Sequence, residues 1–259
     1  MEKSYVTPLV FDIKRTSTVD GPGIRTTVFF KGCNLDCFWC HNPEGKSPRP
    51  QLGLLTEKCI HCGVCQKICE HRDECVLCGK CAANCPVDAR KIYGRSYITD
   101  ELLEIILADR DYYIATGGGV TFSGGECMLY PDFLAELAKK CFDSGISVAV
   151  DTVGNVPWDY FEKILPFVEC FLYDIKALDP ELHRAGTGIG NSLILENLEK
   201  LIQTGKTIII RTPVIPGYND GDELERISRY CAVRELRHEK LTYHTIGESK
   251  KAALGAIHR

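Results

Sequence analysis

The sequence lacks any apolar run close to the roughly 18 residues that a membrane-spanning helix requires. It also lacks a basic stripe, because 31 lysines and arginines stand against 35 acidic residues, and nucleic-acid-binding proteins carry clustered positive charge. Its first residues hold only a short apolar patch interrupted by Asp12, which differs from a secretory signal. These absences predict a cytoplasmic protein that binds neither membranes nor nucleic acids.

Cysteine, in contrast, is abundant: the chain has 15 in 259 residues, and eleven of them lie between Cys33 and Cys85. Without a secretory signal, so many cysteines indicate metal or redox chemistry rather than disulfides. A disulfide scaffold would also spread its cysteines to link distant loops, whereas a cluster protein concentrates them at short, fixed spacings. We therefore predict an iron–sulfur protein.

Outside residues 46–95 the sequence alternates between short apolar segments, typical of buried parallel strands, and helical segments. The predicted strands are Thr26–Lys31, Val120–Ser123, Ser147–Asp151, Phe171–Ile175, Thr207–Arg211 and Lys240–Tyr243. The predicted helices include Asp100–Asp109, one that begins at Pro131 and stops at Gly145, and Asn191–Thr204. Six strands with helical crossovers predict an α/β fold, a partial (β/α)6 TIM-like barrel whose chemistry lies at the carboxyl ends of the strands.

Residues 46–95 interrupt this alternation and are predicted to be an inserted ferredoxin-like module, with residues 1–45 and 96–259 forming the barrel. The insert repeats the spacing C-x2-C-x2-C-x3-C, as in bacterial ferredoxins that hold two 4Fe–4S clusters. The fourth cysteine of each such run binds the other cluster, which predicts the sets Cys59, Cys62, Cys65, Cys85 and Cys75, Cys78, Cys81, Cys69. The expected role is electron relay.

Two departures from the ferredoxin pattern affect this wiring. Only five residues separate Cys69 from Cys75, so the hairpin usual between ferredoxin halves is nearly absent. Glu70 also stands where the first run would normally have proline. Zinc is the alternative metal, although zinc ribbons do not need eight cysteines in a doubled run.

A separate motif, Cys33, Cys37 and Cys40, follows the first predicted strand with the spacing C-x3-C-x2-C. Cysteine thiolates hold cluster iron, and three of them leave one iron open, as catalytic zinc sites keep an open position. The alternatives are a zinc knuckle or three unrelated thiols. The position at the end of a barrel strand favours a catalytic 4Fe–4S cluster.

This spacing, with the aromatic Trp39 before the third cysteine, resembles the radical S-adenosylmethionine (radical SAM) superfamily. Four blocks together resemble its glycyl-radical-enzyme activating enzymes, in the subgroup with a ferredoxin insert: Thr18–Glu44, Gly117–Glu126, Phe171–Asp179 and Tyr243–Lys250. The resemblance implies that S-adenosylmethionine (SAM) binds the open iron and is cleaved to methionine and a 5′-deoxyadenosyl radical. That radical would abstract hydrogen from a glycine of a partner glycyl radical enzyme. The electron donor would be a flavodoxin or ferredoxin, and the chain a monomer.

The resemblance also implies which residues surround the cofactor. The expected set is Trp39, Gly124, Gly125, Glu126, Asp151, Thr152, Asp174, Lys176 and His244. Within this set, the Gly-Gly-Glu motif would hold the amino group of SAM, Lys176 would contact its carboxylate, and His244 would lie near its ribose. Without the resemblance, a plain turn, a salt bridge and a structural histidine are the ordinary interpretations.

Two further roles are implied in the same way. Asp151, Thr152 and Asp174 would bind a monovalent cation beside SAM, since carboxylates at neighbouring strand ends suit a hard cation. Asp20, in the Asp-Gly-Pro-Gly loop before the first strand, would face the substrate peptide as part of the catalytic set. Cys127 follows the Gly-Gly-Glu motif and is interpreted as a buried thiol, not a fourth ligand.

Three alternatives to an activating enzyme stay open at this stage. One is a radical SAM enzyme acting on a small molecule or another peptide residue, which the Asp-Gly-Pro-Gly loop and small barrel disfavour. Another is a pure electron-transfer protein, which would need neither the three-cysteine loop nor the Gly-Gly-Glu motif. The third is a degenerate relative, because the region from Pro216 to His244 is compressed.

Overall fold

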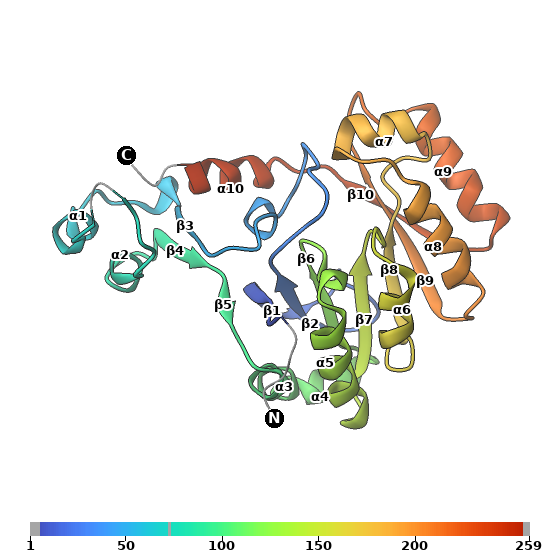
Figure 1. Cartoon of the computed structure of the whole chain (residues 1–259), viewed down its shortest axis with the longest axis horizontal. Coiled ribbons are helices and arrows are strands. Elements are labelled where there is room, and N and C mark those ends of the chain that lie inside the picture. The colour runs from blue at the N-terminus through green and yellow to red at the C-terminus, as the bar shows by residue number, and fades with distance from the viewer. Residues whose placement is uncertain (1–5, 72–73, 256–259) are drawn as a thin grey trace.

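The computed structural model describes residues 6–71 and 74–255 of the chain. Within these residues the main sheet has the strand order β10-β9-β8-β7-β6-β2-β1-β5 (Figure 1). Its parallel strands are β2 (Arg25–Phe30), β6 (Gly119–Gly124), β7 (Ser147–Thr152), β8 (Cys170–Asp174), β9 (Thr207–Val214) and β10 (Arg237–Thr242). Each overlaps a strand predicted from the sequence, and the mainly parallel α/β fold is confirmed.

Two strands of this sheet have no counterpart in the sequence prediction. β1 (Leu9–Ser17) runs antiparallel to β2, and β5 (Arg95–Ser96) runs antiparallel to β1, so the sheet continues beyond its first parallel strand. β1 buries only some of its residues, so its sequence is more polar than that of the central strands. β5 is two residues long, which is too short to leave any pattern.

Helices connect the parallel strands, and Figure 1 shows α5, α6, α8 and α9 along the outer side of the sheet. The set is α3 (Thr99–Leu107), α4 (Arg110–Thr116), α5 (Pro131–Asp143), α6 (Trp158–Ile164), α7 (Pro180–Thr187), α8 (Ser192–Ile202) and α9 (Asp222–Val233). Helices α3, α5 and α8 overlap the predicted helices. Proline opens α5, and the helix ends before Gly145, whose φ of 72° is a conformation that glycine adopts without strain.

The central strands bury both faces, as parallel sheets covered by helices do. Side chains such as Val150 and Ile210 belong to the large core cluster with the helices. Their chain neighbours Ala149 and Ile209 belong to a smaller cluster, because successive residues of a strand point to opposite faces. Burial on both sides fixes the strand register, so the loops at the carboxyl ends of the strands start from a rigid edge.

Residues 51–93 form a lobe that projects from the barrel, with α1 and α2 at its far end in Figure 1. Its base is β3 (Gln51–Leu54), paired antiparallel with β4 (Arg90–Tyr93). Between these strands lie η2 (Thr56–Lys58), α1 (Val64–Ile68) and α2 (Lys80–Ala83). The chain rejoins the main sheet at β5, which begins at Arg95.

The C-terminal helix α10 (Ile246–Gly255) lies between the lobe and the barrel (Figure 1). Its Gly247 is so close to the preceding cysteine loop that an added Cβ would sit 2.3 Å from the Cys40 carbonyl oxygen. Further along α10, Lys250 Nζ lies 2.9 Å from the buried Glu44, in the short helix η1 (Pro43–Gly45). The helix therefore packs against the cysteine loop.

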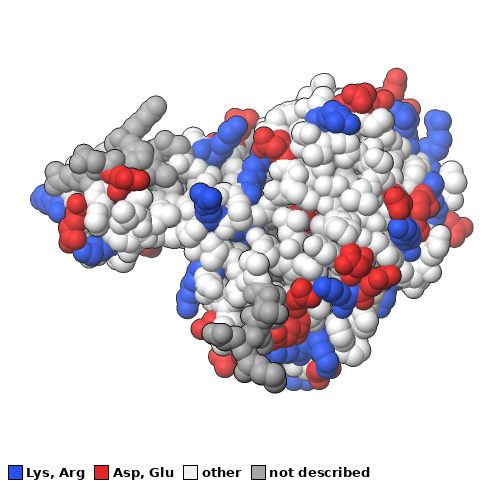
Figure 2. All heavy atoms as spheres, in the orientation of Figure 1, with Lys and Arg blue, Asp and Glu red and all other residues white. Residues whose placement is uncertain are grey.

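Charged side chains of both signs are interspersed over the face of the barrel drawn in Figure 2. This agrees with the near balance of acidic and basic residues in the sequence. Among the described residues, no helix combines the length and the apolar character needed to cross a membrane. The face of the barrel drawn in Figure 2 therefore has no surface of one dominant charge.

Replacing Asn197 of α8 by alanine should destabilise the fold. The Asn197 Nδ2 donates to the carbonyl oxygens of Gly154 and Val156, both at 2.8 Å, in the loop after β7. Because the residue is fully buried, truncation leaves two carbonyls without a donor, and we expect a loss of about 2–3 kcal/mol in the free energy of unfolding. Chemical denaturation followed by circular dichroism measures it.

The matched control is Glu196→Gln, one residue earlier on the exposed side of the same helix. It should change the free energy of unfolding by less than about 0.5 kcal/mol. If Asn197→Ala were as mild as this control, the two hydrogen bonds would not hold the β7 loop.

Candidate active site and metal centres

The cysteines of the first motif come together in the structure. Cys33, Cys37 and Cys40 line one cavity of about 200 Å³, on the loop that follows β2. The facing wall comes from residues at the carboxyl ends of β6, β7, β8 and β9. Cys127 is not part of the lining; its buried thiol donates to the Phe122 carbonyl at 3.4 Å. The cavity therefore has three cysteines and no fourth.

Backbone hydrogen bonds hold the cysteine loop at both ends. Gly32 N donates to Gly45 O at 2.7 Å, which closes the loop on itself. Asp36 N donates to Thr187 O at 2.8 Å, which fixes the loop to the end of α7. Trp39, on the same loop, is buried and lines the cavity. Main-chain hydrogen bonds therefore fix the loop that carries the three thiols.

The protonation of these thiols favours metal binding over nucleophilic chemistry. Burial raises the pKa of Cys33 to about 12 and raises the pKa of Cys37 and Cys40 as well, and the Lys176 ammonium opposes these shifts. A thiol with a raised pKa is a poor nucleophile at neutral pH, whereas coordination to a metal removes its proton outright. Three thiols around one cavity, one buried and two half-buried, fit a metal cluster.

Glycines let the end of β6 approach the cysteine loop. A Cβ on Gly125 would lie 2.2 Å from Gly32 O and 2.6 Å from Gly45 O, so any other residue would push the two segments apart. Instead, Gly125 N donates to Phe30 O at 2.8 Å, and Glu126 N donates to Gly32 O at 2.7 Å. The backbone of the Gly-Gly-Glu motif therefore forms part of the cavity wall.

The Glu126 side chain points away from the cavity and does not line it. Its carboxylate accepts hydrogen bonds from Thr152 Oγ1 at 2.8 Å, and from Met128 N and Val153 N, each at 3.0 Å. These bonds tie the end of β6 to the end of β7. The glycines of the motif thus face the cavity, while the glutamate braces two strand ends from behind.

Charged side chains of both signs form the wall opposite the cysteines: Asp151, Asp174, Lys176 and Arg211. Lys176 Nζ lies 2.7 Å from Asp174 Oδ2, and Arg211 Nη1 lies 3.6 Å from Asp151 Oδ2. Burial lowers the pKa of Lys176, but nearby negative charge, above all that of Asp174, outweighs burial. The pKa of Lys176 therefore lies above its ordinary value. Burial raises the pKa of Asp151 to about 6 against the Arg211 charge. Such paired charges suit a zwitterionic ligand.

Two cavity residues were left without a role by the sequence. Arg211 stands opposite Asp174 in the register of β8 and β9, so its place near a strand end was the available signal. His41 follows Cys40 directly in the chain and also lines the cavity. Its position beside the cysteine motif was a signal for it.

Besides Glu126, two predicted residues lie outside the cavity lining. Asp20 accepts hydrogen bonds from Ser17 Oγ at 2.5 Å and from Thr27 Oγ1 at 2.9 Å, in the loop between β1 and β2. His244 is exposed after β10, with its ring 6.1 Å from the ring of His41 between the centroids. In this structure His41 lines the cavity, and His244 lies beside His41 outside the lining.

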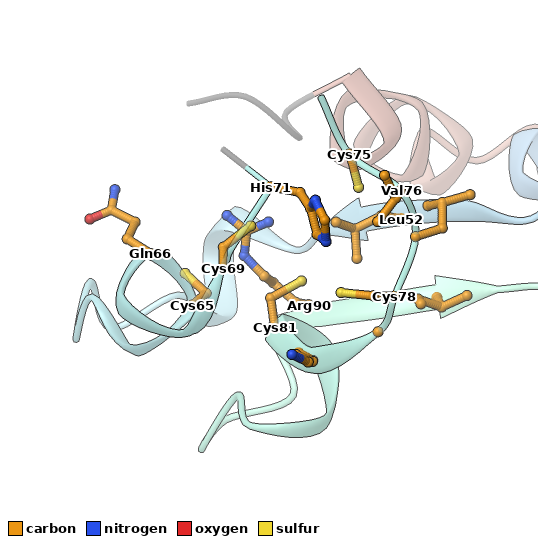
Figure 3. Close-up of a pocket in the computed structure, with 14 residues that line it drawn as sticks. Leu52, Cys65, Gln66, Cys69, His71, Cys75, Val76, Cys78, Cys81 and Arg90 are labelled. Atoms are coloured by element: carbon orange, nitrogen blue, oxygen red, sulfur yellow. The ribbon is translucent and has the colours of Figure 1, made fainter. Parts of the chain in front are cut away.

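The cysteines of the lobe divide between two cavities. One, of about 470 Å³, is lined by Cys65, Cys69, Cys75, Cys78 and Cys81 (Figure 3). The other, of about 690 Å³, is lined by Cys59, Cys62, Cys65 and Cys85. Cys69 thus lies with the second run and Cys85 with the first. Across the described residues, no three histidine, cysteine or acidic side chains converge closely enough to hold a single metal ion.

The two cysteine runs repeat each other in backbone conformation as well as in spacing. His61 and Leu77 occupy equivalent positions with φ values of 52° and 55°. Gly63 and Gly79 likewise precede α1 and α2 with φ values of 73° and 77°. Positive φ at a non-glycine residue is uncommon, so its recurrence at the same position of each run marks two copies of one loop.

Comparisons with known proteins agree with this geometry. The radical SAM superfamily matches residues 27–231 of the chain. The isethionate sulfite-lyase activating enzyme of Oleidesulfovibrio alaskensis is 38% identical, over 96% of this chain and 87% of its own length. The trans-4-hydroxy-L-proline dehydratase activating enzyme of Clostridioides difficile is 39% identical, over 94% and 86%.

A solved structure is similar in fold at much lower identity. Streptococcus suis SuiB, bound to its precursor peptide SuiA, has a TM-score of 0.57 and 13% sequence identity. The match covers 85% of this chain and 39% of SuiB. At that identity the likeness concerns the fold alone.

Glu126 should make the free energy of unfolding depend on pH. Burial raises the pKa of its carboxyl to about 7, while an unfolded glutamate titrates near about 4.3, so the folded chain binds the extra proton and loses stability as the pH rises between these values. Glu126→Gln cannot titrate. We expect the stability of the parent relative to this variant to fall by up to roughly 1.4 kcal/mol per pH unit, then level off above about pH 7.

Chemical denaturation of the cluster-free chain at several pH values measures this difference. A flat or rising difference for Glu126→Gln would contradict the raised pKa.

Proposed function

The chain belongs to the radical SAM superfamily and, within it, to the glycyl radical enzyme activating enzymes, and we propose from this that it installs a radical on one glycine of a partner enzyme. One observation carries the proposal to the residues: three cysteines without a fourth face two glycines and paired charges in one cavity. That arrangement provides ligands for a cluster with one open iron and a wall for a charged cosubstrate.

Cys33, Cys37 and Cys40 would hold the catalytic 4Fe–4S cluster. Bound there, the cluster and SAM supply one-electron cleavage of the sulfonium to methionine and a 5′-deoxyadenosyl radical, which takes a hydrogen atom from the partner's glycine. The chain would contribute three thiolate ligands and leave the fourth iron open to SAM. The thiols must lose their protons to bind iron, so cluster assembly releases protons.

The charged wall would orient SAM. Lys176 and Arg211 would bind its carboxylate, because both cations line the cavity. Lys176 lies there beside Asp174, and Arg211 lies near Asp151. Backbone carbonyls of Gly124 and Gly125 would accept hydrogen bonds from its ammonium group. By fixing both groups, these residues would orient SAM for cleavage, which is the contribution that positioning makes to such a reaction.

The same wall offers a site for a monovalent cation at Asp151 and Asp174. Carboxylate oxygens at neighbouring strand ends are ligands that hard cations prefer. The Thr152 hydroxyl already donates to Glu126 and accepts from Gly154 N at 2.8 Å, so it contributes less to this proposal than the two aspartates.

The Asp-Gly-Pro-Gly loop would present the partner's glycine to the cavity. Arg211 Nη2 donates to Val19 O at 3.1 Å, which connects the residue before Asp20 to the charged wall. Val19 itself is 60% exposed, so this loop has free surface for a peptide. By the same family resemblance His244 would approach the ribose of SAM from the mouth, beside His41.

The lobe would hold two more 4Fe–4S clusters that relay electrons from a flavodoxin or ferredoxin. The division of its cysteines between two cavities supports crossed wiring, with Cys69 in the cluster of the second run and Cys85 in that of the first. All cysteines in the described residues are free, which suits a reducing cytoplasm. We further propose that the chain acts as a monomer on its partner.

The identity of the partner is a separate question. The two relatives named above are nearly equally similar to this chain, yet one activates isethionate sulfite-lyase and the other trans-4-hydroxy-L-proline dehydratase. Overall similarity therefore does not select a partner. We propose a glycyl radical enzyme as a class and test it with both of these enzymes.

Reductive cleavage of SAM and transfer to glycine should both be measurable. The anaerobically reconstituted chain, reduced with dithionite, should release 5′-deoxyadenosine from SAM, and a matching partner should gain a glycyl-radical signal in electron paramagnetic resonance. Changing Cys33, Cys37 and Cys40 together to alanine should reduce both to background, because the catalytic cluster loses its ligands. Cys127→Ala, a buried cysteine outside the cavity, should leave both in place.

Each failure has its own meaning. Product without a glycyl radical on either partner, and without one on a wider set of such enzymes, would favour a small-molecule or other peptide substrate. If the parent chain and the variant without Cys33, Cys37 and Cys40 bound equal amounts of iron, and neither released 5′-deoxyadenosine, an electron carrier would be favoured. That result would overturn the proposed function.

Crossed wiring in the lobe can be tested by counting iron. Cys62→Ala and Cys85→Ala should each remove about four irons per chain, and the double variant should remove the same four, because both residues serve one cluster. Cys62→Ala with Cys69→Ala should remove about eight, because these residues serve different clusters. The reverse result for the two pairs would show that each run binds its own cluster.

A further inference from the structure

Arg90 stands at the wall shared by the two cavities of the lobe. It begins β4, paired with Leu54 of β3, and its side chain lines both cavities. Figure 3 shows its guanidinium lying among Cys65, Cys69 and Cys81. No function has been given to this residue by the sequence motifs, which concern only the cysteines.

The guanidinium lacks the partners that a half-buried cation needs. Its Nε is buried, and no residue in the described ranges accepts its hydrogen or forms an ion pair with it. A buried donor without an acceptor is destabilising, because the hydrogen bond that it made to water is lost without replacement. Among the described residues, the Arg90 Nε–H is therefore a buried donor without an acceptor at the wall that the two cavities share.

Two other cations of the lobe, Lys80 and Lys91, each lie beside an acidic side chain. Lys80 also lines the first cavity, but its Nζ lies 2.7 Å from Glu70 Oε1. Lys91, the next residue of β4, lies 3.7 Å from Asp12 and lines neither cavity. Arg90, in contrast, lines both cavities, as does the predicted cluster ligand Cys65.

An iron–sulfur cluster bound by four thiolates is an anion and gains a further negative charge when it is reduced. Its potential depends on net charge and on hydrogen bonds to its sulfurs. Building on the proposed function of the lobe, we propose that Arg90 interacts with both lobe clusters and raises their reduction potentials. It donates hydrogen bonds to sulfur on both sides of the wall and stabilises the reduced state of each cluster, so the relay accepts an electron from the donor more readily.

The test is a redox titration of the full chain, reconstituted with iron and sulfide and followed by electron paramagnetic resonance. Arg90→Gln should lower the midpoint potentials of both lobe clusters, with at least a tenfold change in the reduction equilibrium, which is 59 mV for a one-electron couple. Arg90→Lys keeps the charge but has one compact ammonium in place of the planar fork. It should therefore move the two potentials apart, because the ammonium serves one cavity at a time.

Lys91→Gln is the matched control, since it removes one positive charge from the adjacent residue, whose side chain leaves the opposite face of β4. The potentials of both lobe clusters in Lys91→Gln should equal those of the parent.

Iron content tests the presence of the lobe clusters separately from the role of Arg90. A parent chain with about four irons instead of about twelve would overturn the lobe clusters themselves.

Full iron with unchanged potentials in Arg90→Gln would overturn the role of Arg90 alone. Should Arg90→Gln fail to retain the lobe iron, Arg90→Lys decides. Separated potentials with full iron would support the proposal, and potentials equal to those of the parent would overturn it.

Discussion

The close approach of the β6 end to the cysteine loop is the contact on which the rest of the site depends. Only glycine fits at position 125, because a Cβ there would lie 2.2 Å from the Gly32 carbonyl oxygen. This contact places thiols from one loop and charges from neighbouring strand ends around a single cavity. Glu126 then fixes the β7 loop from behind, through Thr152 and Val153. Within three consecutive residues, the motif supplies both close approach and support.

Sequence reasoning succeeded where burial or spacing leaves a local pattern. The central strands are apolar runs because both their faces are buried, and the cysteine spacings are fixed by cluster geometry. β1 was missed because it is only partly buried, and β5 because its two residues exist as a strand only through pairing. The hydrogen bonds of the Glu126 side chain and the presence of His41 rather than His244 in the cavity lining depend on packing between distant segments. Spacing along the chain does not encode these.

The pairing of charges in the cavity gives a physical reason for a cation beside SAM. In the structure Lys176 pairs with Asp174, and Arg211 lies near Asp151. A carboxylate ligand that engages both cations would leave the two aspartates with less compensation in a buried setting, where unpaired charge is costly. A monovalent cation between them would restore the balance. Ligand and cation would then bind cooperatively, because each relieves a charge that the other leaves exposed.

The lobe and the barrel derive their stability from different sources. The barrel has a large buried core, whereas α1 and α2 have five and four residues and bury none of them. Helices this short are not stable by themselves, so the proposed clusters, once bound, would supply much of the lobe's folding free energy. The same anionic clusters would compensate Arg90, the cation at the wall between them. Without clusters, the unpaired buried donor of Arg90 would destabilise the lobe. With both clusters bound, the Arg90 guanidinium would interact electrostatically with each of them.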